Sequence, residues 1–425
     1  MQLAPHIGAE EDFGFVARFT SGNMETTYAR LTEVLRLPKS FTLDFPALNV
    51  FFRLGMFLNG KTAFREIRRV NPKPVFVPTT ALSRDAVIDA YIDLFRQSIR
   101  RRTPPHSALA LSGGCDSRHI LLEMHSQRHL PDYALTVAID GRPSEPEIAS
   151  ELARRTGVKH IVSRLRPSTC VKDELYKNQA CDFTTLEHGW FAGTAGERDS
   201  LPWWDGIAGD VLSAGLFLED WSLRLFEEDR LDELADRLVS SHRVPFFRDQ
   251  ALFPRADAVS EVRAELEKHR PAANPVGSFY FWNRTRVTVA ASAFGLMAPT
   301  GQVTLAPYLD WDLWRLLASL PGRMLLDHNL HRDTVMRAYP SFSDIPFFHT
   351  KVKIRPGIQR RKSFRLLAYL ATASAPDPQQ ILMIIRAFRA LVLPRHINDI
   401  GWLLPVSVYC TELQRLARQK RRVLV

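Results

Sequence analysis

Between residues 83 and 102 the hydrophobic positions follow the period of an amphipathic helix. Ser83 is a suitable N-cap, and Pro104 and Pro105 prevent the helix from continuing. The apolar residues that recur at this spacing are Val87, Ile88, Ala90, Tyr91, Leu94, Phe95 and Ile99. Because helical spacing buries one face of such a segment, we expect the helix to pack beside the strand that follows it.

Apolar runs and helical patterns then alternate along the chain. Strands are predicted at 108–111, 134–139 and 160–162, and helices after Ser117 and over 146–156. Strands that alternate with helices indicate a parallel sheet with helices on both faces. The second half of the chain is mainly helical, so the predicted fold class is α/β with a helix-rich C-terminal half.

The first 80 residues carry shorter patterns. Apolar segments within 51–62 are separated by an Asn-Gly pair, which is a strong turn signal, and a small α+β region is predicted. The 425 residues of the chain exceed the roughly 250–300 residues over which a single core grows. We therefore divide the chain into a small N-terminal region, a central α/β domain and a basic helical extension, at 1–80, 81–355 and 356–425.

A Gly-rich loop follows the first predicted strand and precedes a helix. Its residues are Ser112, Gly113, Gly114, Cys115, Asp116 and Ser117. Adjacent glycines permit close backbone approach, and the N–H groups at a helix start favour an anion. The loop therefore predicts a phosphate cradle. It lacks the Lys of a Gly-Lys-Ser/Thr ending, which excludes a Walker-type loop.

A second glycine-containing loop spans 206–210 and ends at Asp210. Mg²⁺ prefers oxygen ligands, and one or two carboxylates with phosphate oxygens commonly form its shell. Asp116 and Asp210 are therefore candidate Mg²⁺ ligands, although Asp210 by itself is more typical of an N-cap or a turn. A third segment at 307–310, Pro-Tyr-Leu-Asp, predicts a turn in which Asp310 caps an amphipathic helix.

Together these segments resemble the synthetase domain of the asparagine synthetase B family, which includes β-lactam synthetases and lasso-peptide cyclases. The resemblance covers about residues 80–355 and implies an adenine nucleotide α-hydrolase-like domain with the pyrophosphate loop of N-type ATP pyrophosphatases. The residues implied to bind ATP are Ser112, Gly113, Gly114, Asp116, Ser117, Ala138 at the strand end that faces adenosine, and Gly206 in the second loop. The resemblance also implies that Asp116 and Asp210 bind Mg²⁺ and that Lys353 is the catalytic cation.

The chemistry of that family is attack of a carboxylate on the α-phosphate of ATP, loss of pyrophosphate and capture of the acyl-adenylate by an amine. The resemblance thus implies an ATP- and Mg²⁺-dependent carbon–nitrogen ligase. Its substrates would be a small-molecule or peptide carboxylate and an amine or ammonia. Two other interpretations remain open: a tRNA-modifying ATPase with the same loop, and a catalytically idle ATP-binding or scaffold protein.

Three features depart from the family pattern. Gln2 replaces the N-terminal catalytic Cys, and the region 1–80 is too short for a glutaminase domain, so we expect a shortened relic or docking region without glutamine hydrolysis. Ile207 and Val303 lie where the family carries acidic or Tyr residues, so no general base is identified. Arg118 follows the loop and is expected either to contact phosphate or to brace the helix.

The net charge of +10 is concentrated near the C-terminus, where residues 351–425 contain 15 Lys and Arg and 3 Asp and Glu. Such a segment suits an acidic partner or an anionic membrane surface, or simply a solvated helix. No RNA-binding motif accompanies it, so nucleic acid is not the expected partner. No apolar run approaches the roughly 18–20 residues that span a bilayer, and the four cysteines form no C-x-x-C pair. A cytoplasmic protein is expected.

Overall fold

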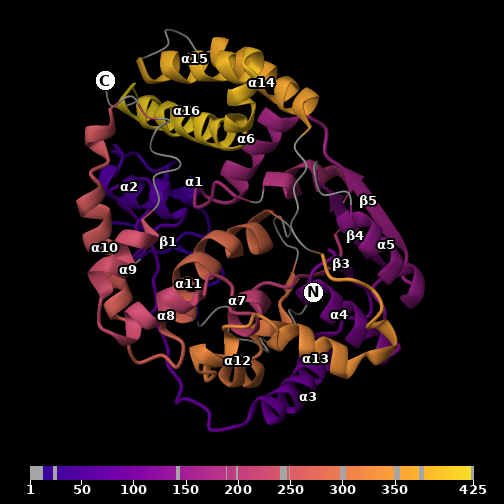
Figure 1. The fold of residues 1–425 in the computed structure, drawn as a ribbon. Helices are drawn as coiled ribbons and strands as arrows, with labels where there is room; N and C mark the ends of the chain where they lie inside the picture. The colour runs from indigo at the N-terminus through magenta and orange to yellow at the C-terminus, as the bar shows by residue number, and fades with distance from the viewer. Residues whose placement is uncertain are drawn as a thin grey trace.

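The computed structural model describes residues 13–22, 26–139, 144–187, 189–197, 200–239, 247, 249–296, 303–348, 355–372 and 378–422 (Figure 1). The strands are β1 (Phe19–Ser21), β2 (Ile67–Arg69), β3 (Ala108–Ala110), β4 (Tyr133–Ala138), β5 (His160–Arg164), β6 (Trp203–Trp204) and β7 (Thr304–Leu305). The α-helices are α1 (Leu31–Val34), α2 (Phe45–Leu54), α3 (Arg84–Arg102), α4 (Cys115–Ser126), α5 (Ser144–Thr156), α6 (Cys170–Ala180), α7 (Gly209–Ser213), α8 (Asp220–Glu227), α9 (Leu231–Leu238), α10 (Arg255–Glu267), α11 (Pro275–Tyr280), α12 (Trp311–Ala318), α13 (Leu330–Ala338), α14 (Pro356–Ala371), α15 (Pro378–Val392) and α16 (Ile400–Arg422). The 3-10 helices include η1 (Gly189–Glu197) and η6 (Pro307–Leu309), and two π-helical segments are η4 (Phe281–Val289) and η5 (Ala291–Leu296).

The central sheet has the strand order β5-β4-β3-β6-β7, and all of its strands run parallel. The strands predicted at 108–111, 134–139 and 160–162 are confirmed as β3, β4 and β5, with ends that shift by one or two residues. The sequence pattern does not predict β6 and β7, because strands of two residues give no periodicity. The order places β3 between β4 and β6, so the carboxyl ends of these three strands meet at one edge.

Side chains of the sheet enter the main core on one face and a small apolar cluster on the other. Leu109 and Ala134 pack with apolar residues of α4 and α5, whereas Leu135 and Trp203 pack with Phe191 of η1. This division follows from the pleat, which directs successive side chains to opposite faces. The predicted α/β class with a covered parallel sheet is confirmed, with α-helices on one face and a layer that includes a 3-10 helix on the other.

A second core joins the two ends of the described chain. Apolar side chains of β1, α2 and β2 pack with those of α14, α15 and α16. The ring of Phe51 stacks on Phe57 at a centroid distance of 4.4 Å and on Tyr409 at 5.2 Å. Asn59 and Gly60 have φ of 55° and 66°, as the predicted Asn-Gly turn requires. The basic C-terminal helices therefore contribute an inner face to a core.

Two caps fix the helices that flank the sheet. Ser83 caps α3 by accepting a 3.3 Å hydrogen bond from Ala86 N, and Asp310 caps α12 as predicted. The Asp310 carboxylate also lies 2.6 Å from the Arg101 guanidinium and 2.8 Å from that of Arg102. These ion pairs tie α3 to the 307–310 turn. Among the helices of the described ranges, none has both the length and the apolarity to cross a membrane.

Candidate functional site

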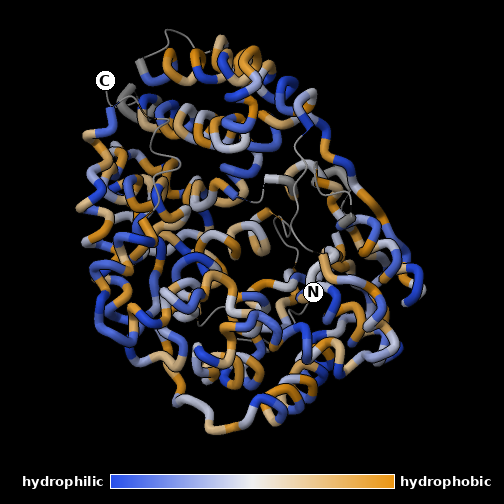
Figure 2. Tube along the Cα trace, in the orientation of Figure 1, coloured by the Kyte–Doolittle hydropathy of each residue, from blue (hydrophilic) through white to orange (hydrophobic). Residues whose placement is uncertain are grey.

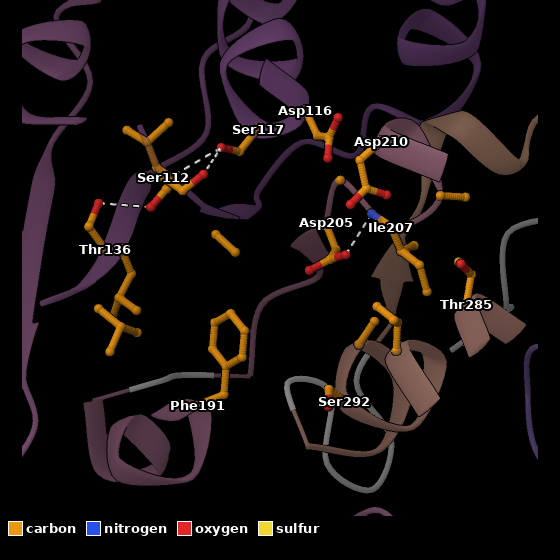
Figure 3. Close-up of a pocket in the computed structure, with 18 of the residues that line it drawn as sticks. Ser112, Asp116, Ser117, Thr136, Phe191, Asp205, Ile207, Asp210, Thr285 and Ser292 are labelled. Atoms are coloured by element: carbon orange, nitrogen blue, oxygen red, sulfur yellow. Dashed lines mark hydrogen bonds between the residues drawn. The ribbon is translucent and has the colours of Figure 1, made fainter. Parts of the chain in front are cut away.

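A cavity of about 320 Å³ lies at the carboxyl ends of β3, β4 and β6 (Figure 3). Its lining includes Ser112, Asp116, Ser117, Thr136, Val137, Ile139, Glu145, Phe191, Asp205, Gly206, Ile207, Asp210, Arg284, Thr285 and Ser292. Ligands of open α/β sheets bind at this edge. The sequence motifs account for the walls from the 112–117 loop, the end of β4 and the 206–210 loop. They do not predict the wall formed by η4 and η5.

The 112–117 loop turns directly into α4. The helix begins at Cys115 and not after Ser117 as predicted, because Gly114 already serves as the N-cap, and it has no side chain to cap the helix. The N–H groups of the first turn therefore remain available for an anion. Ser117 Oγ accepts a 2.9 Å hydrogen bond from Ser112 N and lies 3.0 Å from Ser112 Oγ, so the two serines close the loop.

The chain segment 345–348 covers the loop. A Cβ at Gly113 would lie 2.9 Å from the Cβ of Phe348, whose N–H donates a 2.9 Å hydrogen bond to Gly113 O. Arg118 donates hydrogen bonds to Ile345 O at 2.9 Å and Pro346 O at 2.6 Å, and is 1% exposed. Arg118 thus braces this segment, because both terminal nitrogens of its guanidinium donate to main-chain oxygens, and it does not belong to the described lining of the cavity.

The 206–210 loop lies against the start of α4. A Cβ at Gly206 would be 2.5 Å from the Cβ of Asp116, and one at Gly209 would be 2.6 Å from Asp116 Oδ1. Ala208 has φ of 74° and turns the loop into α7, which carries Asp210 in its first turn. Figure 3 shows Asp116 and Asp210 beside one another at the same end of the cavity. The fold therefore brings the two predicted carboxylates together, and glycines permit the approach.

Asp205 and Asp210, two carboxylates of this cavity, have raised pKa values. Burial, and next the negative charge of Asp116, raise the pKa of Asp210 to about 7. Burial raises the pKa of Asp205 to about 6, although Asp205 Oδ1 accepts a 2.8 Å hydrogen bond from Ile207 N. The positive charge of Arg284 opposes the shift of the Asp210 pKa. Carboxylates that repel one another in this way fit a divalent cation, whose charge removes the repulsion.

Asp116 provides a specific test of this fit. Its Oδ1 is buried and makes no hydrogen bond, and His331 Nδ1 lies 3.1 Å away, also without a hydrogen bond. In the part of the chain that the structure describes, no group of three or more His, Cys, Asp or Glu side chains is placed to hold a metal ion. The carboxylate oxygens of Asp116 and Asp210 fit an Mg²⁺ ion that binds two carboxylates and completes its coordination shell with phosphate oxygens and water.

His331 is a residue of the site that the sequence pattern does not reveal. It is fully buried, and its Nε2 lies 3.2 Å from Tyr308 Oη and 3.3 Å from His119 Nδ1. Burial lowers the pKa of His119 well below its usual value. His331 belongs to α13, far from Asp116 in the sequence, so no spacing between ligands could have identified it.

The end of β4 forms the wall predicted to face adenosine. Val137 and Ile139 line the cavity on either side of Ala138, whereas Ala138 does not belong to the described lining. Phe191 points toward the same space from η1 (Figure 3). These side chains give this end of the cavity an apolar surface, which suits a purine ring. Thr136 adds a hydroxyl to the same wall.

Lys353 and Gln2 lie outside the described residues. The described chain contacts the 112–117 loop at Phe348, five residues before Lys353 in the sequence. Of the two positions that depart from the family pattern, Ile207 lines the cavity, whereas Val303 is 40% exposed and does not belong to the described lining. Asp205, which the sequence motifs do not assign, brings a carboxylate into the cavity beside Ile207.

No protein-family model matches this chain, and a search of curated proteins finds no match either. The functional interpretation therefore depends on the geometry of the cavity. Three features of the cavity support that interpretation: the uncapped start of α4, the two carboxylates that glycines allow to approach each other, and the partly apolar wall at the end of β4.

Proposed function

We propose that this chain is an ATP- and Mg²⁺-dependent ligase that joins a carboxylate to an amine or ammonia and releases AMP and pyrophosphate. One observation carries the proposal: the uncapped start of α4, Asp116 and Asp210 meet in one cavity at the carboxyl edge of a parallel sheet. A helix start favours phosphate, and paired carboxylates favour Mg²⁺. The cavity therefore suits a nucleoside triphosphate.

In the proposed reaction a carboxylate oxygen attacks the α-phosphorus of ATP, and the bond from that phosphorus to the bridging oxygen breaks as pyrophosphate leaves. The N–H groups at the start of α4 would hold the departing phosphates, and Asp116 and Asp210 would hold Mg²⁺. When bound, Mg²⁺ neutralises negative charge on the leaving group. An amine nitrogen then attacks the acyl carbon, AMP leaves with the electrons of the broken bond, and the amine gives up a proton.

Asp205 is the residue that we propose to accept that proton. It follows β6, lines the cavity and does not belong to the proposed Mg²⁺ pair. From η4, Arg284 and Thr285 offer polar groups to a substrate. The Arg284 guanidinium lies 2.6 Å from the Glu187 carboxylate, so its position is held before an anionic substrate arrives. We assign Asp205 the role of base and the η4–η5 wall that of substrate contact.

The test is release of AMP and pyrophosphate from ATP in the presence of a panel of acids with ammonia or amines. Asp116→Asn should abolish it, whereas Asp220→Asn, a change to an exposed acid in the first turn of α8, should not. Formation of ADP would contradict adenylation, because it indicates transfer of the γ-phosphoryl group. Tight binding of ATP with Mg²⁺ but no pyrophosphate across the panel would favour the idle binding protein. Turnover that requires RNA would favour the tRNA-modifying enzyme.

A further inference from the structure

The outer faces of α14 and α15 carry residues that are unusual on a solvated surface. On α14 the exposed positions are Pro356, Gly357, Arg360, Arg361, Phe364, Arg365, Ala368 and Ala371. On the described part of α15 they are Ile381, Ile385, Phe388, Arg389 and Val392. Each set recurs at intervals of mainly three or four residues and therefore forms one face of its helix. The face of α15 is mostly branched or aromatic, and that of α14 is rich in arginine.

The inner faces of the same helices already pack against the protein. Leu366 of α14 and Met383 of α15 are buried in the second core, whereas Phe364 is 59% exposed and Phe388 is 55% exposed. Figure 1 shows the two helices as the outermost layer at the end of the molecule opposite α3, and Figure 2 shows apolar segments along them. A helix that packs on one side normally has a polar outer side. The exposed apolar row of α15 therefore indicates a partner or an apolar phase.

The charge of this layer identifies the partner. Neither helix contains an Asp or Glu. Arg360, Arg361 and Arg365 surround a surface hollow together with Phe364, and Arg166 borders the hollow from the segment after β5. Arginines beside exposed aromatic and branched side chains match an anionic bilayer, where the cations meet headgroup phosphates and the apolar side chains enter the acyl boundary. An acidic protein would account for the arginines but not for the apolar row of α15.

We propose that α14 and α15 dock this protein on the surface of an anionic phospholipid bilayer. The apolar row of α15 enters the interface, and the arginines of α14 contact lipid phosphates. In Figure 1 this layer lies away from α4 and α7, which carry the candidate site, so a docked protein keeps its cavity accessible. The inference goes beyond the proposed ligase activity and does not depend on it.

The full chain should sediment with vesicles that contain phosphatidylglycerol and should remain in solution with vesicles of phosphatidylcholine alone, and added salt should release it. The triple change Arg360→Gln, Arg361→Gln and Arg365→Gln should weaken binding about a hundredfold, since each arginine near an anionic surface contributes about fivefold. The control with the same change of net charge replaces other exposed arginines by Gln: Arg154, Arg224 and Arg323. It should weaken binding far less.

The apolar row is tested by Ile385→Ser with Phe388→Ser, which should weaken vesicle binding about tenfold. Leu82→Ser, at a position that is 45% exposed and directly precedes the cap of α3 in the sequence, should leave it unchanged. Equal loss in the test and control variants, or no binding to anionic vesicles, would overturn the proposal. A dimer that Ile385→Ser with Phe388→Ser disrupts would assign the face to a second copy. If polyglutamate binds as tightly as the anionic vesicles, the face formed by α14 and α15 would be assigned to an acidic protein partner.

Discussion

Among the glycines of the 112–117 and 206–210 loops, Gly206 leaves the least room for a side chain, and Gly206→Ala tests whether the two loops must touch. The added Cβ would lie 2.5 Å from the Cβ of Asp116 and 3.4 Å from Ser117 N. Carbon atoms in ordinary contact are about 3.5–4.0 Å apart, so the two loops must separate by about 1 Å. The nearest atoms belong to the first turn of α4 and not to the end of a flexible side chain, so they move only with the backbone.

Overpacking of this kind costs about 1–3 kcal/mol in the free energy of unfolding. A displacement of about 1 Å in a catalytic arrangement reduces a rate by about 10²-fold. For Gly206→Ala we therefore expect a lower melting temperature. Calorimetry should give a dissociation constant for ATP with Mg²⁺ that is about tenfold higher, and the rate of pyrophosphate release should fall about a hundredfold.

Gly401→Ala is the matched control. No heavy atom lies within 4 Å of the Cβ that it adds, and Gly401 lies within α16, where alanine favours the helix by about 1 kcal/mol. This variant should bind ATP as the wild type does and melt at the same temperature or higher. If Gly206→Ala binds ATP with unchanged affinity, the reasoning that the two loops must touch to build the site is refuted.

Other features of the site give further predictions. Asp210 has a pKa raised from 3.8 to about 7 in the folded protein, so between these pH values the folded state holds a proton that the unfolded chain has lost. The melting temperature of the metal-free protein should therefore fall as the pH rises from about 4 to about 7. The melting temperature of Asp210→Asn should lack this contribution to the pH dependence. Mg²⁺ with ATP should stabilise the wild type against heat but not Asp210→Asn. Burial raises the pKa of the Cys115 thiol to about 12, so mass spectrometry should find it unmodified by iodoacetamide in the native protein at mildly alkaline pH. Arg118→Lys loses a planar fork that donates to two main-chain oxygens, and urea unfolding should show a loss of about 1–3 kcal/mol.

The sequence predicts those parts of the site whose residues are consecutive in the chain. The 112–117 loop combines a strand, a glycine turn and a helix start, and each has a local signature. The turn at Asp310 is predicted for the same reason. His331 and Arg284 have no such signature, because each reaches the site through the packing of a separate helix. The role of β6 is also hidden, since two residues are too few to show a period.

The second core shows a related limit. The apolar faces of α2 and α16 indicate that each helix is buried, but a helical period does not say against which partner. The packing of Phe51 on Tyr409 joins segments that the sequence assigns to opposite ends of the chain. Such a pairing depends on the whole topology, which places the first and last elements side by side.

The strongest physical reason to expect a cation at the site is the contrast between the carboxylate of Asp310 and the pair formed by Asp116 and Asp210. Asp310 is buried and carries its counter-ions, with Arg101 at 2.6 Å and Arg102 at 2.8 Å. Asp116 and Asp210 lie together at a cavity, where the charge of one raises the pKa of the other and the buried Oδ1 of Asp116 makes no hydrogen bond. This arrangement costs stability whenever both carboxylates are ionised, and a bound cation would remove that cost. Asp310 is thus paired with two arginines, whereas Asp116 faces the imidazole of His331 at 3.1 Å and the charge of Arg284 that acts on Asp210 is shared with Glu187. Two carboxylates that face each other at a cavity with so little positive charge have the electrostatics of a binding site, where some stability is given up for a ligand.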